Sequence, residues 1–156
     1  MGIGSSEEKL DNAKTLLKRL TNREVAYTKA RRRLPEFGIR KDQRIGAVVT
    51  LRGKPAKEFL ARALDASSNS IASGSIARNS VNFGVKEYIY FNGVKYDPKL
   101  GMLGLNVNAS FARKGLRVER RKRKTGKIPA RHREITKEEI KKYLERDFGA
   151  KIVEKE

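Results

Sequence analysis

Apolar residues recur at helical spacing in three stretches of the chain, residues 5–22, 53–66 and 136–149. Ser5 with Glu8, and Thr136 with Glu139, have the spacing of a capping box at a helix start. Gly149 suits the end of the third helix. The apolar stripes are Leu10, Ala13, Leu17 and Leu20; Phe59, Leu60, Ala63 and Leu64; and Ile140, Leu144 and Phe148.

Alternating apolar and polar residues predict strands at 43–52, 81–91 and 103–113, while 25–33 looks extended and 115–122 is a candidate to pair back as a hairpin. In 43–52, Ile45, Ala47, Val49 and Leu51 form one face, and Arg44, Val48, Thr50 and Arg52 form the other. In 103–113, Asn106, Asn108 and Ser110 alternate with apolar residues. Residues 67–80 are small and polar, without a period.

The order α, β, β, α, β, β, β, α predicts an α+β fold with a mostly antiparallel sheet and helices on one face. A length of 156 residues favours a single domain, residues 1–156. Within it we expect a mobile loop at 67–80 and a basic hairpin extension at 116–133.

Charge is the extreme property of this composition. Lys and Arg total 37 against 18 Asp and Glu, and the net charge of +19 opposes folding by self-repulsion. A polyanionic partner removes that cost. Nucleic acid is the first candidate and an acidic membrane surface the second, although no apolar run approaches the roughly 20 residues that span a bilayer.

The chain offers little for catalysis. It has no Cys, and its single His132 lies between Arg131 and Arg133, where neighbouring cations oppose protonation. Most carboxylates lie singly or beside Lys on helix faces, as solvated charges do. We therefore predict no enzyme, no catalytic residue, no metal and no cofactor.

Binding to RNA is easier to build from these residues. Asn is a poor strand former, so Asn106 and Asn108 in a predicted strand need another explanation. Their amides, like hydroxyls, both donate and accept hydrogen bonds, which suits ribose hydroxyls and base edges in the shallow groove of RNA. An ordinary polar sheet face is the alternative, and the nearby cations favour RNA. Those cations are Arg31, Arg32, Arg33, Arg44 and Arg52. The aromatic residues are scattered and do not form the paired motif on which bases of single-stranded RNA stack. We therefore expect a structured RNA, recognised by its backbone and shape.

Residues 28–53, TKARRRLPEFGIRKDQRIGAVVTLRG, resemble the universal large-subunit ribosomal protein L five family, which pairs with 5S ribosomal RNA. The family pattern there is Thr/Ser-Lys-Ala-Arg/Lys, then Phe-Gly-Ile-Arg, then a strand similar to Ile-Gly-x-x-Val-Thr-Leu-Arg-Gly. Further matches are NFGVKEYI (82–89), GVKYDPKLGMLGL (93–105) and RRKRKTGKIPARHREITKEEI (120–140). The last is typical of the archaeal and eukaryotic branch.

The resemblance implies a ferredoxin-like domain in the large ribosomal subunit of the cytoplasm, with the sheet on 5S rRNA. The partners it implies are 5S rRNA, large-subunit rRNA, peptidyl-site tRNA, and neighbouring proteins of the central protuberance and the small-subunit head, with no membrane. A free architectural nucleic-acid-binding protein is the alternative. The rRNA-binding candidates are Arg23, Thr28, Lys29, Arg31, Arg32, Arg44, Thr50, Arg52, Asn106, Asn108, Arg120, Arg121, Lys122, Arg123, Lys124, Lys127, Arg131, His132 and Arg133; the tRNA-facing candidates in 67–80 are Ser70, Ser73, Gly74, Ser75 and Arg78.

The chain departs from the family pattern at two places. The family carries a strand ending in Asn before its Met-Gly turn, whereas here that Met is Met1. We therefore expect an unpaired sheet edge. Asn22-Arg23 stands where the family commonly has Gly-Gln, which puts an amide contact in doubt and favours a phosphate contact for Arg23.

Overall fold

The computed structural model describes residues 1–4 and 6–153, which form two compact units. Unit 1 comprises Met1–Arg62 and Val85–Leu105, and unit 2 comprises Ala63–Gly84 and the chain from Asn106 onward. The α+β class is confirmed. In place of one sheet, the described residues form three small ones, with strand orders β1-β2, β3-β7 and β4-β5-β6.

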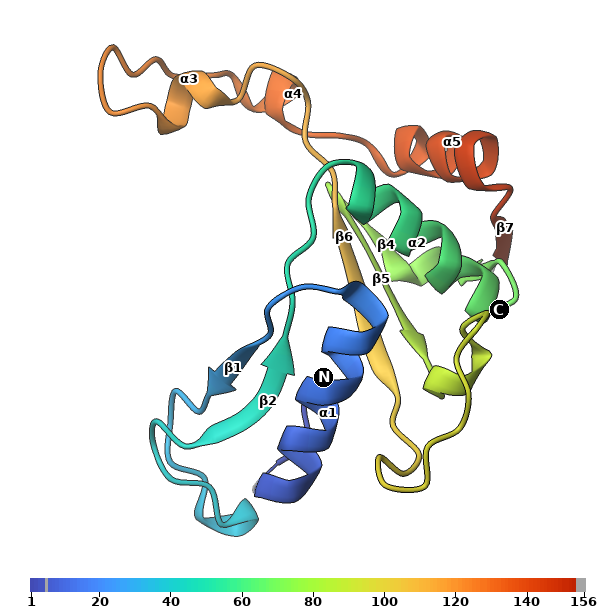
Figure 1. Cartoon of the computed structure of the whole chain (residues 1–156). Helices are drawn as coiled ribbons and strands as arrows, with labels where there is room; N and C mark the ends of the chain where they lie inside the picture. The colour runs from blue at the N-terminus through green and yellow to red at the C-terminus, as the bar shows by residue number, and fades with distance from the viewer. Residues whose placement is uncertain (5, 154–156) are drawn as a thin grey trace. The chain divides into compact units, whose positions relative to one another are not determined.

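In unit 1, helix α1 (Glu7–Thr21) packs on the antiparallel pair β1 (Ala26–Lys29) and β2 (Arg44–Val48) (Figure 1). Ala13, Leu17, Val25 and Ala47 form the core between them. The helix starts after Ser6, whose side chain makes no cap bond; Ser5 lies outside the described residues. Asn22 ends the helix in the left-handed region, at φ 50°.

The second edge of β2 is occupied by the start of the chain, so the expectation of an unpaired edge was wrong. The backbone amide of Ala47 donates to the carbonyl of Met1, and that of Ile3 donates to Ile45, each at 2.9 Å. Gly46 makes this approach possible, because a Cβ there would lie 2.5 Å from the Met1 carbonyl oxygen and 2.6 Å from Thr28 Oγ1.

The connection between β1 and β2, residues 30–43, carries an exposed tip. A 3-10 turn, η1 (Pro35–Phe37), is closed by a bridge between Leu34 and Ile39, and Phe37 is 68% exposed. A turn at Lys41-Asp42 leads into β2, with Asp42 at φ 64°.

Helix α2 (Lys54–Ala66) follows, with Pro55 at its second position, where no amide is needed for the helix ladder. The expected strand 81–91 is shorter than predicted: β5 (Ser80–Val85) ends early, and η3 (Tyr88–Tyr90) follows. Tyr88 and Phe91 turn into the interior, each 1% exposed, and the Phe91 ring stacks on Phe59 of α2 at 5.8 Å.

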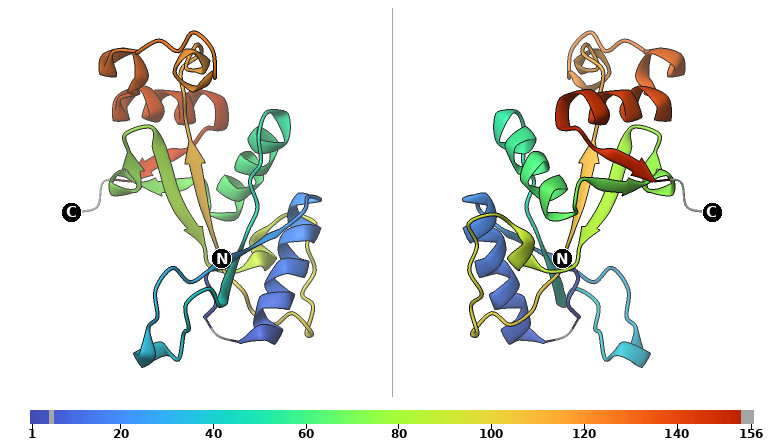
Figure 2. Two further views of the ribbon diagram at one scale, coloured as in Figure 1. Left: turned by 90° about the vertical axis from the view of Figure 1, so that its left-hand side faces the viewer. Right: turned by 90° about the vertical axis from the view of Figure 1, so that its right-hand side faces the viewer.

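Residues 67–80 are ordered secondary structure, so the prediction of an irregular loop was wrong. They contain β3 (Ser70–Ala72), η2 (Ser73–Ser75) and β4 (Ile76–Ala77), and Ile71 and Ile76 are each 1% exposed. These two isolated apolar side chains anchor the segment in the core, although they give no recognisable period. Strand β3 pairs in parallel with β7 (Lys151–Val153), and β4 pairs antiparallel with β5, beside β6 (Leu105–Ser110) (Figure 2).

The basic segment, residues 116–133, is not the β-hairpin that was predicted. It contains two helical turns, α3 (Arg117–Arg120) and α4 (Ala130–Arg133), and leaves β6 to return at α5 (Lys137–Phe148) (Figure 1). Cations facing one another across a hairpin would repel, and helical turns spread them apart. The capping box of Thr136 and Glu139 and the left-handed Gly149 of α5 are confirmed.

Candidate nucleic-acid interface

Unit 1 presents exposed cations around β1 and β2. Within the described residues none of these cations forms an ion pair, whereas Lys18 and Arg19 pair with Glu24 and Asp97. In addition, Lys29 lies opposite Arg44 across the strands, an unfavourable arrangement of like charges. A bound polyanion would relieve it. The exposed cations are Arg23, Lys29, Arg31, Arg32, Arg33, Arg44 and Arg52.

The face of β1 and β2 that points away from α1 carries the hydroxyl groups. Thr28 lies opposite Gly46, and Ala26 opposite Val48, on the side opposite Ala47 and the core. Thr50 lies two residues beyond Val48, past the end of β2, and is exposed. We call this surface, together with Arg31, Arg32 and Arg52, the outer face of unit 1.

Arg44 does not lie on that outer face, contrary to the strand alternation. The register shifts between Thr28 and Lys29, so that Arg44, and not Ile45, faces Lys29. The Arg44 guanidinium lies 4.8 Å from the Tyr27 ring centroid, and Lys14 Nζ of α1 is equally close.

The Tyr27 hydroxyl donates a 2.6 Å hydrogen bond to Asp11 of α1. That bond, more than any other cause, raises the pKa of the phenol, which keeps Tyr27 protonated as the donor. Tyr27 thus ties Arg44 to the helix side of unit 1.

In unit 2, the polar face of β6 matches the prediction. Asn106, Asn108 and Ser110 are exposed, while Leu105 and Val107 are buried. Asn106 leans over Gly84 of the neighbouring strand, where a Cβ would meet Asn106 Oδ1 at 3.3 Å. Thr50 belongs to unit 1, so its joint action with the two asparagines stays a prediction.

The basic segment carries nine Lys and Arg residues and a single acid, Glu119. The Glu119 carboxylate accepts a 3.1 Å hydrogen bond from the Ile128 amide and lies 3.7 Å from Arg133. Of the predicted contacts, Arg133 is therefore paired. The remaining predicted contacts are exposed: Arg120, Arg121, Lys122, Arg123, Lys124, Lys127, Arg131 and His132.

The tRNA-facing candidates are placed less uniformly. Ser70, Gly74 and Arg78 are exposed, and Ser73 and Ser75 are half-buried in η2. Arg78 lies 3.6 Å from the Glu134 carboxylate, and is therefore paired.

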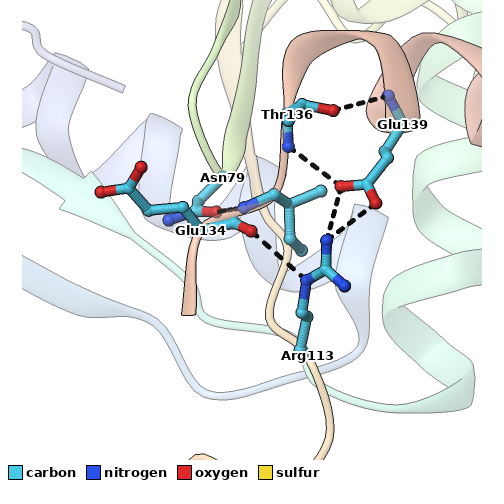
Figure 3. Close-up of polar contacts among 6 residues, drawn as sticks. Asn79, Arg113, Glu134, Thr136 and Glu139 are labelled. Carbon is cyan, nitrogen blue, oxygen red and sulfur yellow. Dashed lines mark hydrogen bonds and ion pairs between the residues drawn. The ribbon is translucent and has the colours of Figure 1, made fainter. Parts of the chain in front are cut away.

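Sequence reasoning missed a polar cluster where the basic segment begins and ends (Figure 3). Arg113 donates to both carboxylate oxygens of Glu139, at 2.7 and 2.8 Å, and to the Glu134 carbonyl at 3.3 Å. Asn79 Oδ1 accepts from the Ile135 amide at 2.6 Å. The capping box identified Glu139 as a helix cap, but no local pattern indicated its partner 26 residues earlier.

Neither a membrane span nor a metal site is visible in the described part of the chain. No helix there is long and apolar enough to cross a bilayer. No three His, Asp or Glu side chains gather there to hold a metal ion.

Together these surfaces define a strongly basic α+β protein suited to a polyanionic partner. Residues 44–143 match the model that describes the C-terminus of the ribosomal protein L five family. The protein is 43% identical over 155 residues to the large ribosomal subunit protein uL5 of Sulfurisphaera tokodaii, covering 99% of this chain and 88% of the relative. The uL5 of Aeropyrum pernix is 44% identical over 155 residues, which cover 98% of this chain and 80% of the relative. The uL5 of Nanoarchaeum equitans is 43% identical over 154 residues, which cover 98% of this chain and 90% of the relative. The chain belongs to the uL5 family of ribosomal proteins, in its archaeal form, a structural and non-enzymatic family.

Proposed function

We propose that this protein is a structural constituent of the large ribosomal subunit, and that residues 1–156 act there as one module that binds 5S rRNA and large-subunit rRNA. The observation that carries the proposal is the outer face of unit 1, where hydroxyls and cations lie exposed without acid partners among the described residues. Phosphates would neutralise those cations, and hydroxyls suit ribose and base edges.

The two basic surfaces have different tasks in this proposal. The outer face of unit 1, with Thr28, Thr50 and Arg52, binds 5S rRNA, and Asn106 and Asn108 of β6 add polar contacts. The basic segment enters grooves of large-subunit rRNA, where backbone and shape are read. The protein would then help to form the central protuberance of the cytoplasmic ribosome, beside neighbouring ribosomal proteins and the small-subunit head.

A contact with peptidyl-site tRNA through residues 67–80 rests on the family resemblance alone. The buried Ile71 and Ile76 remove the argument from mobility, and Arg78 is already paired. The tip of the β1–β2 connection is a second candidate surface for that contact. There Leu34 and Phe37 are exposed and follow the exposed Arg31, Arg32 and Arg33 in the chain; an aromatic ring together with cations suits an unstacked base.

Thr50→Val tests the outer face of unit 1. The side chains have similar shapes, but valine leaves an RNA partner unpaired, which costs about 1–3 kcal/mol of binding free energy. Filter binding to a 5S rRNA transcript should show roughly five- to hundredfold weaker affinity, with the melting temperature unchanged. Thr50→Ser keeps the hydroxyl and should bind as the wild type does. Equal affinity for all three proteins would remove Thr50 from the interface.

The alternative of a free architectural protein makes a different prediction about location. A ribosomal constituent co-sediments with large subunits in a sucrose gradient of cell extract, and stays there at moderate salt. A protein found mainly in free fractions or on DNA would contradict the ribosomal proposal.

A further inference from the structure

We propose that Glu119 and Glu139 are positioning residues for RNA binding: they hold the basic segment in its binding conformation, so that removing either negative charge weakens the affinity for RNA. This inference rests on the proposed function of the basic segment. The expected effect on affinity is opposite to the usual one, because an acid near a phosphate-binding surface ordinarily opposes binding.

The first support is the clamp at the base of the segment. Arg113 precedes the segment and Glu139 follows it, and Arg113 Nη2 lies 2.7 and 2.8 Å from the two carboxylate oxygens of Glu139. Two adjacent guanidinium nitrogens with different partners fix the orientation of the side chain as well as its distance: Nη2 donates to Glu139 and Nε to the Glu134 carbonyl. The same Arg113 donates to the Glu134 carbonyl at 3.3 Å, so one side chain holds the returning chain at two points (Figure 3).

The Glu139 carboxylate is itself held in place. It accepts a 3.0 Å hydrogen bond from the Thr136 amide, while Thr136 Oγ1 accepts from the Glu139 amide at 3.3 Å. The clamp is therefore built on the first turn of α5, a regular helix of 12 residues.

Asn79 secures the same place from the β4–β5 turn. Its side chain accepts from the Ile135 amide at 2.6 Å, and its carbonyl accepts from the Phe111 amide at 2.8 Å. The backbone before the basic segment, at Phe111, and the backbone after it, at Ile135, are thus both hydrogen-bonded to Asn79, independently of Arg113.

The second support lies inside the segment. Glu119 of α3 accepts from the Ile128 amide at 3.1 Å and lies 3.7 Å from Arg133 of α4. The Gly126 amide donates to the Val118 carbonyl at 3.2 Å, which closes the same fold-back. Nine cations repel one another, and without these links the free segment would spread over many conformations. Ordering those conformations on RNA would reduce affinity.

Three variants with the same charge change separate this idea from general electrostatics. Glu119→Gln and Glu139→Gln each remove one negative charge and one linkage. Glu138→Gln removes the same charge from the neighbouring residue, whose exposed side chain has no hydrogen bond or ion pair among the described residues. The probe is protein-free archaeal large-subunit rRNA, with a 5S rRNA transcript measured in parallel.

We expect Glu138→Gln to bind large-subunit rRNA as tightly as the wild type or slightly more tightly. Glu119→Gln and Glu139→Gln should bind roughly three- to thirtyfold more weakly, the range expected for one charge-assisted link. Affinity for 5S rRNA should stay unchanged in all three, which a general loss of folding would not allow. If Glu139→Gln destabilises unit 2, Arg113→Lys replaces it, since Lys keeps the charge and loses the planar guanidinium that donates to Glu139 and to the Glu134 carbonyl at once.

Limited trypsin digestion of the free proteins gives a readout that needs no RNA, because trypsin cuts at the Lys and Arg residues of the segment. The clamp variants should be cut within residues 116–133 several-fold faster than Glu138→Gln. Equal digestion, or RNA binding at least as tight as that of Glu138→Gln, would overturn the inference. A wild type that binds large-subunit rRNA no better than an unrelated protein of equal charge would instead refute the proposed function, and the trypsin comparison would still decide whether the clamp orders the segment.

Discussion

At the scale of single residues, several side chains serve two elements at once. Tyr27 accepts cations on its ring and donates to Asp11, which joins β1 and β2 to α1. The Glu139 carboxylate completes a helix cap and receives Arg113 from the chain before the basic segment. Substituting such a residue should change both elements together.

The pH dependence of folding stability should include a contribution from the ionisation of the Glu139 carboxyl. The amide of Thr136 and the Arg113 guanidinium lower the pKa of this carboxyl from its ordinary value of 4.5, against an opposing effect of desolvation. A lowered folded-state pKa gives stabilisation that is full above about pH 4.5 and is lost as the pH falls through the lower folded value.

We expect the difference in unfolding free energy between the wild type and Glu139→Gln to shrink as the pH falls below about 4.5. Denaturant unfolding at a series of pH values measures it. Glu138→Gln, whose side chain is exposed in the same helical turn, should keep the wild-type pH profile. Parallel curves for the wild type and Glu139→Gln would show that the clamp adds no stability.

At the scale of elements, the segment 67–80 is a structural part of unit 2. Ile71 and Ile76 are buried within β3 and β4, and β3 holds β7 in a parallel pair. Removing the whole segment would therefore take away core residues, and its exposed side chains are the proper target for tests of tRNA contact.

Ile76→Ala should destabilise the protein by about 2–5 kcal/mol, the usual cost of deleting a buried aliphatic side chain. Ser70→Ala on the exposed side of β3 is the matched control and should change stability by no more than about 0.5 kcal/mol. Chemical denaturation measures both. Equal stability of the two variants would show that the Ile76 side chain adds nothing to the core and that the segment behaves as a flexible loop.

At the scale of the whole molecule, the net charge of +19 is distributed between the two ends of the sequence. Residues 1–64 carry a net charge of +9 and residues 116–156 one of +7, against +3 between them. In the proposed function each end meets RNA, and phosphates offset the repulsion that the free protein bears.

Binding to rRNA should therefore weaken steeply with salt. Each neutralised phosphate contributes roughly 0.7–0.9 to the slope of log affinity against log salt concentration. Replacing Arg120, Arg121, Lys122 and Arg123 with Gln should lower that slope for large-subunit rRNA by up to about four such increments, and leave the 5S slope nearly unchanged. Filter binding between about 50 and 300 mM salt measures both slopes. A flat response of the wild type would contradict the electrostatic part of the proposal.

Local pattern was sufficient wherever neighbours in sequence are also neighbours in space. Helices α1 and α5, the cap of Thr136 and Glu139, and the alternation of Asn106 and Asn108 on β6 follow from side chains within a few residues of one another. The excess of cations likewise indicated a polyanionic partner without any coordinates.

Only tertiary structure decided where distant segments pair. The bulge that moves Arg44 toward Tyr27 depends on the register between β1 and β2, and the position of Ile71 depends on the pairing of β3 with the distant β7. The link from Arg113 to Glu139 closes a loop of 26 residues. Such contacts compete with many alternative registers and loop closures, whose free energies depend on the whole packed unit and leave no local period in the sequence.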